Sequence, residues 1–169
     1  FGTDSIMIGD TTTGTIDAAD NNVGLGVDVF AALTSGDNNV AIGKSALKAN
    51  TTGNENVAVG IETLFLGTAC IGNTAVGRIA LRANTSNNNT AVGNAALTSN
   101  TSGSNNIAMG SYALQTNTTS SNNTAVGRGA LLANTAADNT AVGYNALASS
   151  TTATQVTALG FRAGEDSTA

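Results

Sequence analysis

The sequence predicts an all-β chain that winds into a parallel β-solenoid of about ten 16–17-residue coils. Three observations support this fold class: a short repeat along the whole chain, β-branched residues inside the repeat, and polar loops between its copies. The repeat is seen most simply as the pattern apolar–Ala–apolar–Gly. Its closing glycines are 16 or 17 residues apart and are Gly9, Gly26, Gly43, Gly60, Gly77, Gly93, Gly110, Gly127, Gly143 and Gly160.

The residue types within one unit favour strands over helices. A unit of this length is too short for two helices and their turns, and Val, Ile and Thr just before the glycine favour a strand. Clusters of Asn, Thr, Ser and Gly then interrupt any helical pattern. We therefore expect two short strands per coil, with coils stacked at about 4.8 Å, so that ten coils extend over about 48 Å.

Equivalent positions should stack into columns along the solenoid, and we count these positions from the closing glycine as zero. Side chains alternate between the two faces of a strand. The larger aliphatic residues and Thr at positions −3 and −1, such as Thr90 and Val92, are therefore predicted to face the core. Leu at position +4, such as Leu97, and small residues at +6 are predicted to join them from the second strand.

Position −2 is never polar and is Ala in most units. If positions −3 and −1 face inward, this column faces outward, and a long uncharged strip rarely stays in contact with water. We therefore predict that it packs against another chain, although steric crowding within a narrow coil would also select small residues. The predicted interface residues are Ala41, Ala58, Ala75, Ala91, Ala108, Ala125, Ala141 and Ala158.

Two further columns carry structural expectations. Asn at position −4, such as Asn106, would form a stacked amide ladder, or each Asn would simply serve in its own turn. The repeated Gly at position 0 is expected at a corner, with a positive φ or a close approach of two backbones. The lone Cys70 lies in an unusual coil, where it is expected to fill space and not to react.

Composition excludes several function classes. The chain has 6 Lys and Arg against 11 Asp and Glu, a net charge of −5, no His and one Cys. These numbers argue against a basic nucleic-acid binder, against His-based catalysis or metal binding, and against a disulfide framework. No run of 18 apolar residues predicts a membrane span. We expect no catalytic activity, no cofactor, no metal site, no nucleic-acid partner and no membrane insertion by this segment.

Acidic residues offer only weak alternatives to that expectation. Asp4, Asp10, Asp17 and Asp20 could supply oxygen ligands to Ca²⁺, but their spacing matches no calcium loop and a solvated end coil is favoured. A glycosidase would need paired carboxylates in a groove, whereas Glu55, Glu62 and Asp138 are scattered along the chain.

All basic residues and several aromatic residues fall between positions +1 and +5, on one outer face just past the corner glycine. This face is either ordinary solvated decoration or a shallow binding strip for a glycan, a matrix protein or a host surface. The candidate binding residues are Lys44, Lys48, Phe65, Arg78, Arg82, Tyr112, Arg128 and Tyr144.

The segments Asn39–Gly43, Asn56–Gly60 and Asn106–Gly110 resemble the head repeats of YadA-like trimeric autotransporter adhesins. The longer form Asn123–Leu131, with Asn134 and Thr135 after it, is similar to repeats of phage tail-fibre-like surface proteins. The resemblance implies a left-handed parallel β-roll, a homotrimer and a role in attachment to a host, matrix or glycan surface. It also implies an extracellular location, on the outer membrane or as a virion fibre.

The resemblance covers the chain almost from end to end, which favours one β-roll domain over residues 1–169. Residues 1–22 would form an atypical first coil, and residues 161–169 the end of the domain or its continuation. An ice-binding solenoid is the alternative function. It is suggested by the Thr column at position +8, which consists of Thr51, Thr68, Thr85, Thr101, Thr118, Thr135 and Thr151.

Overall fold

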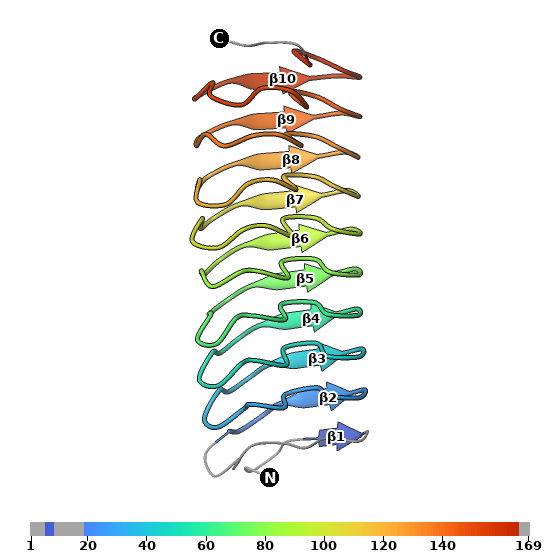
Figure 1. The fold of residues 1–169 in the computed structure, drawn as a ribbon, viewed down its shortest axis with the longest axis vertical. Helices are drawn as coiled ribbons and strands as arrows, with labels where there is room; N and C mark the ends of the chain where they lie inside the picture. The colour runs from blue at the N-terminus through green and yellow to red at the C-terminus, as the bar shows by residue number, and fades with distance from the viewer. Residues whose placement is uncertain (1–5, 9–18, 166–169) are drawn as a thin grey trace.

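The computed structural model describes residues 6–8 and 19–165, and these form a parallel β-solenoid of about eight turns without a helix. Ten strands of three residues lie in one parallel sheet, in chain order from β1 to β10 (Figure 1). Their bounds are β1 Ile6–Ile8, β2 Val23–Leu25, β3 Val40–Ile42, β4 Val57–Val59, β5 Thr74–Val76, β6 Thr90–Val92, β7 Ile107–Met109, β8 Thr124–Val126, β9 Thr140–Val142 and β10 Thr157–Leu159. The predicted fold class is confirmed at this level.

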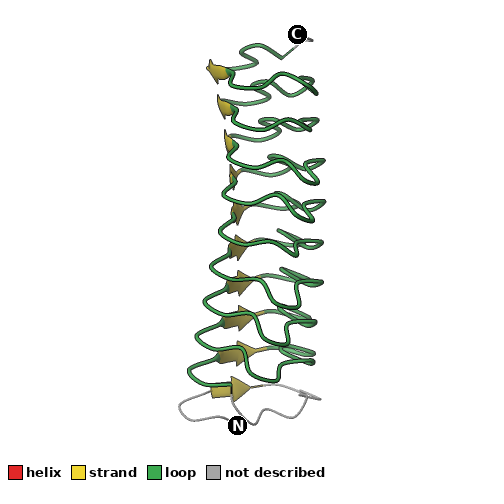
Figure 2. Cartoon of the chain, turned by 90° about the vertical axis from the view of Figure 1, so that its left-hand side faces the viewer, coloured by secondary structure: helices red, strands yellow, loops and turns green. Residues whose placement is uncertain are grey.

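Within the described residues each turn contains one strand, and the predicted second strand does not form. Figure 2 shows the strands along one side of the stack, with loops and turns making up the rest of each coil. The backbone is left-handed at positions +2 and +4, as at Ala95 (φ 57°) and Leu97 (φ 49°). A strand cannot continue through such residues. Leu at +4 is nevertheless buried as predicted, whereas Ala83 at +6 is only half-buried.

The predicted orientation of the strand is wrong. In β6 the middle residue Ala91 is fully buried, while Val92 is 38% exposed and Thr90 is half-buried. Position −2 therefore faces the interior, and positions −3 and −1 face outward. The reversed residues, none more than 8% exposed, are Ala41, Ala58, Ala75, Ala91, Ala108, Ala125, Ala141 and Ala158.

The width of the coil explains the reversal. The Ala column belongs to one buried cluster with Leu at +4 and Ala at +3, for example Leu97 and Ala96. Interiors are close-packed, so a coil that already holds a Leu on one wall leaves room for only a methyl group on the facing wall. Because one chain encloses the Ala column completely, this column cannot be the predicted interface with a partner.

The Asn residues at position −4 form the amide ladder. Asn106 donates from its backbone N–H (3.0 Å) and from its side-chain Nδ2 (3.2 Å) to the Oδ1 of Asn89. Its own Oδ1 accepts from the N–H of Asn123 at 2.9 Å, and its Nδ2 also donates to the carbonyl of Ser120 at 2.9 Å. These side chains are buried, so the bonds replace the water that the amides lose on folding.

The Gly at position 0 is a corner at which neighbouring coils touch. Gly93 has φ 136°, and a Cβ built on it would lie 2.6 Å from the carbonyl carbon of Gly110. Both the conformation and the contact exclude a side chain, because L-residues rarely adopt this φ and the obstacle is backbone. The expected corner with a positive φ and a close approach is confirmed at this glycine.

A second buried Asn, at position +7, closes the turn on the far side of the coil. In the 17-residue unit Asn100 donates from Nδ2 to the carbonyl of Gly103, three residues on. In the 16-residue unit Asn84 donates instead to the carbonyl of Ser86, two residues on. The missing residue therefore falls inside this turn, and the strand register is unaffected.

Cys70 compensates for a missing Asn in one coil. Gly67 stands at position +7, and a Cβ on it would lie 2.5 Å from the Sγ of Cys70. The thiol fills the space that the amide occupies elsewhere and donates to the carbonyl of Asn84 at 3.5 Å. Burial raises the pKa of the Cys70 thiol, which keeps it protonated and supports the expected space-filling role.

Candidate functional site

The outward face of the sheet is a continuous, uncharged strip, which we call the outer strip. The parallel register places position −3 on −3 and −1 on −1 in every strand pair. From β2 to β10 the strip consists of Val23, Val40, Val57, Thr74, Thr90, Ile107, Thr124, Thr140 and Thr157 beside Leu25, Ile42, Val59, Val76, Val92, Met109, Val126, Val142 and Leu159. These side chains are half-buried or exposed in the single chain.

Several aliphatic side chains of the outer strip are more than a third exposed to solvent. Leu25 is 46% exposed, Met109 43% and Ile107 38%. A contiguous uncharged strip with this many exposed aliphatic side chains is typical of a surface that another molecule covers. The sequence analysis assigned these two columns to the core and the Ala column to the exterior, so it did not identify this surface.

The predicted basic and aromatic strip divides into two groups, and the first surrounds Phe65. Lys48 Nζ lies 6.0 Å and Arg82 Cζ 5.0 Å from the centroid of the Phe65 ring, one from each neighbouring coil. Lys48 also pairs with Asp28 at 3.0 Å, and Arg82 pairs with Glu62 at 2.8 Å. The charges of this group are therefore balanced within the chain, as expected for a stabilising surface ladder.

The cations around Glu62 lower the pKa of its carboxyl group. Its hydrogen bond from Arg82 lowers the pKa of its carboxyl, and the charges of Arg82, Arg78 and Lys44 add to this effect. Of the predicted candidates, Lys44 and Arg78 thus lie close enough to act on Glu62 electrostatically.

The second group surrounds Arg128, which projects between aromatic residues of two neighbouring coils. Its Cζ lies 5.7 Å from the ring centroid of Tyr112 and 5.6 Å from that of Tyr144. Its Nη1 donates to the hydroxyl of Tyr144 at 3.3 Å. Tyr144 in turn stacks on Phe161, with centroids 5.3 Å apart. The structure therefore brings together three predicted candidates and one aromatic residue that the sequence reasoning did not select.

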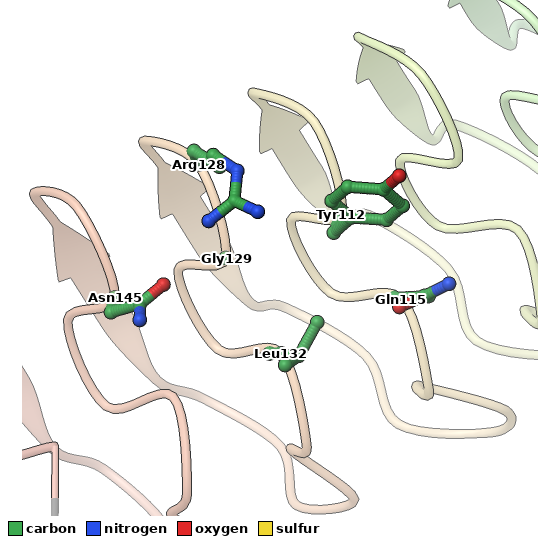
Figure 3. A pocket seen from close by; sticks show the side chains of 6 residues that line it. All are labelled: Tyr112, Gln115, Arg128, Gly129, Leu132 and Asn145. Atoms are coloured by element: carbon green, nitrogen blue, oxygen red, sulfur yellow. The ribbon is translucent and has the colours of Figure 1, made fainter.

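A surface hollow of about 280 Å³ opens beside Arg128. Figure 3 shows its lining side chains on three successive coils, with the guanidinium group projecting into the opening. The lining residues are Tyr112, Gln115, Arg128, Gly129, Leu132 and Asn145. Only Tyr112 and Arg128 were predicted. The others have no distinctive signal in sequence, because neutral residues become a site only when adjacent coils align them.

Most Thr residues at position +8 are exposed, and four of the seven, Thr51, Thr85, Thr101 and Thr135, donate from Oγ1 to a carbonyl of the neighbouring coil. Thr51 Oγ1 donates to the carbonyl of Thr68 at 2.9 Å, and Thr101 Oγ1 donates to that of Thr118 at 3.0 Å. The hydroxyl hydrogens of these four residues are therefore used within the solenoid and are not presented to an external lattice.

Other candidates from the sequence lie apart from both groups. Asp4, Asp10 and Asp17 are outside the described residues, whereas the N–H of Asp20 donates to Asp37 Oδ1 at 2.8 Å. Across residues 6–8 and 19–165, no group of three His, Cys, Asp or Glu is placed to hold a metal ion. The same residues contain no helix long and apolar enough to span a membrane.

Comparison with known proteins adds no further evidence. No protein-family model matches the chain, and neither a curated protein nor a solved structure matches it significantly.

Proposed function

We propose that this chain is a non-catalytic attachment module that assembles with copies of itself into a surface fibre. The observation that carries the proposal is the outer strip, which runs over nine consecutive strands without a charged residue. Exposed aliphatic side chains in such a continuous arrangement gain free energy when another surface removes them from water, by about 25 cal/mol for each Å².

A second copy of the chain is the occupant that best fits the strip. Every coil repeats the same pair of outward side chains in register, so a partner needs the same rise per coil to match it along its length. An identical solenoid meets that requirement in each coil. Long uncharged aliphatic surfaces that are not covered are also liable to uncontrolled association, which a closed oligomer prevents.

The resemblance to trimeric adhesin heads supports three copies and a left-handed coil. On that basis the function is attachment of a cell or virion to a host, matrix or glycan surface, with the solenoid as a rigid extracellular spacer. The surfaces that remain outward after assembly, including the residues around Arg128, would contact the receptor.

Light scattering coupled to size exclusion tests the assembly. We expect a particle of about three times the chain mass of 16.6 kDa at micromolar concentration. Val92→Lys places a charge in the outer strip and should reduce the particle to one chain, whereas Arg82→Ala on another face should leave it assembled. A wild-type chain that remains folded and monomeric at this concentration would contradict the proposal.

Ice binding is the second candidate, now because of the sheet and not because of the Thr column at +8. Five of the outward residues at position −3 are Thr, and they lie beside aliphatic residues on one face of the parallel sheet, as in Thr124 and Val126 of β8. Thermal hysteresis that disappears in Thr124→Lys would support this function over assembly. Its absence in the wild-type protein would dismiss it.

A further inference from the structure

We propose that the hollow beside Arg128 binds a sugar that carries a carboxylate. The inference deepens the attachment function and rests on it for its biological meaning, but one chain forms the whole hollow. Three properties of the site determine the ligand class: a cation free to bind an acid, an aromatic wall with amides beside it, and a small volume.

Arg128 differs from the cations of this surface that form ion pairs within the chain. Lys48 and Arg82 each bind a carboxylate within the chain, and Arg162 binds Glu165. Within the described residues, by contrast, the contacts of Arg128 are with tyrosines. A guanidinium group held in this way retains N–H donors in a planar fork, which matches a carboxylate in a bidentate arrangement.

The remaining wall suits the body of a sugar. The Tyr112 ring offers an apolar face on which the C–H groups of a pyranose can pack, and Leu132 extends the apolar surface. Gln115 and Asn145 supply amide donors and acceptors for hydroxyl groups. Asn145 Nδ2 already donates to Glu165 at 3.4 Å, so its Oδ1 remains to accept from a ligand hydroxyl.

Gly129 creates the opening. It stands at position +2, where the coil before it carries Tyr112 and the coil after it carries Asn145. A Cβ on Gly129 would lie 2.3 Å from Asn145 Oδ1. Because glycine has no side chain, the space between Tyr112 and Asn145 stays open. The volume of about 280 Å³ is at the small end of ligand pockets, which fits one sugar ring and not an extended chain.

The charge of the site favours a carboxylate over a phosphate. Among the described residues one cation and no acidic group line the hollow, and Glu165, which Asn145 contacts, is held by Arg162. A single guanidinium group balances one negative charge, whereas phosphate sites collect several cations or a set of backbone N–H groups.

An NMR titration of the assembled protein with N-acetylneuraminic acid, glucuronic acid and neutral galactose tests the site. We expect saturable shifts of the Gly129 amide and the Asn145 side-chain amide with at least one acid, and at least about tenfold weaker binding of galactose. Arg128→Gln should weaken acid binding by about tenfold or more. The matched control Arg78→Gln, at the same position in another coil, should leave it unchanged.

The inference fails if neither acid shifts these signals, if galactose binds equally well, or if Arg128→Gln binds the acid as tightly as the wild type. Tyr112→Ala provides a second check, because it should weaken binding of the acid while Arg128 remains. Light scattering on the same samples separates the two proposals. An assembled protein that binds no acid refutes only the sugar site, and a monomer that binds refutes only the assembly.

Discussion

The two faces of the same three-residue strands follow different rules. The inward residue is Ala in every strand from β3 to β10, whereas the outward residues vary among Val, Ile, Leu, Met and Thr. Inside, volume decides, because Leu at +4 leaves space for only one methyl group. On the outward face the size of the side chain varies, and the property that all of these residues share is the absence of charge. On these strands small size therefore marks the inward face, and uncharged, mostly β-branched residues mark the outward face.

A charge placed on the inner face should have the largest effect. Ala108 is fully buried among apolar side chains, so Ala108→Asp would bury a carboxylate without a partner. We expect a loss of roughly 3–5 kcal/mol or more, enough to unfold most of the chain. Circular dichroism during thermal denaturation measures this effect.

The adjacent residue provides the control for that variant. Ile107 is 38% exposed, so Ile107→Asp should keep the β-sheet spectrum while it interferes with assembly. If both variants fold equally well, or if only Ile107→Asp unfolds, the assignment of the two faces is wrong.

Loss of one rung of the amide ladder should have the next largest effect. Asn106→Ala removes the acceptor of the Asn123 N–H and the donor to the Ser120 carbonyl, both in the buried part of the coil. We expect the free energy of unfolding to fall by about 2–4 kcal/mol in urea. Asn94→Ala, the same change on the outer surface, should have little effect. Similar losses for both would show that the ladder contributes no special stability.

The unusual coil tests whether interior positions are coupled. Gly67→Asn alone should clash with the Cys70 thiol, and Cys70→Gly alone should leave a void. Together they restore the pairing seen at Asn50 and Gly53, where the two residues bond to each other. We expect the double variant to be more stable than the sum of the single effects predicts, by about 1–3 kcal/mol. Additive losses in a denaturant series would contradict the compensation.

The smallest effect concerns an outer ion pair. Arg82 lowers the pKa of Glu62 in the folded chain. The ion pair therefore contributes fully to folding stability at a pH above the ordinary pKa of a glutamate. The contribution disappears as the pH falls through the lowered pKa of the folded state. NMR titration should place the Glu62 midpoint below that of an ordinary glutamate, and Arg82→Gln should raise it. An unchanged midpoint in Arg82→Gln would show that the bond does not persist in solution.

Much of the fold could be predicted from periodicity. The spacing of the glycines predicts stacked coils of 16–17 residues, and the register of the strands confirms them. Periodicity does not determine which face of a strand points inward, because both faces repeat with the same period. A second strand was expected to carry Leu97, but the left-handed backbone at Ala95 and Leu97, which residue type alone does not predict, interrupts it.

The candidate site was predictable only where charge and aromatic character mark it. Arg128, Tyr112 and Tyr144 fall at similar positions in successive units and were selected for that reason. Gly129 and Asn145 were not, since the hollow depends on how neighbouring coils align, which a single unit does not encode.

The labelling of a thiol on each face of β6 tests the central claim most directly. In a Cys70→Ala background, Val92→Cys and Ala91→Cys place one thiol outward and one inward on the same strand. We expect the thiol at 91 to resist a maleimide at every protein concentration. The thiol at 92 should be protected at high concentration and react once dilution separates the copies. A thiol at 92 that reacts equally fast at all concentrations, or a reactive thiol at 91 in the folded protein, would contradict the account.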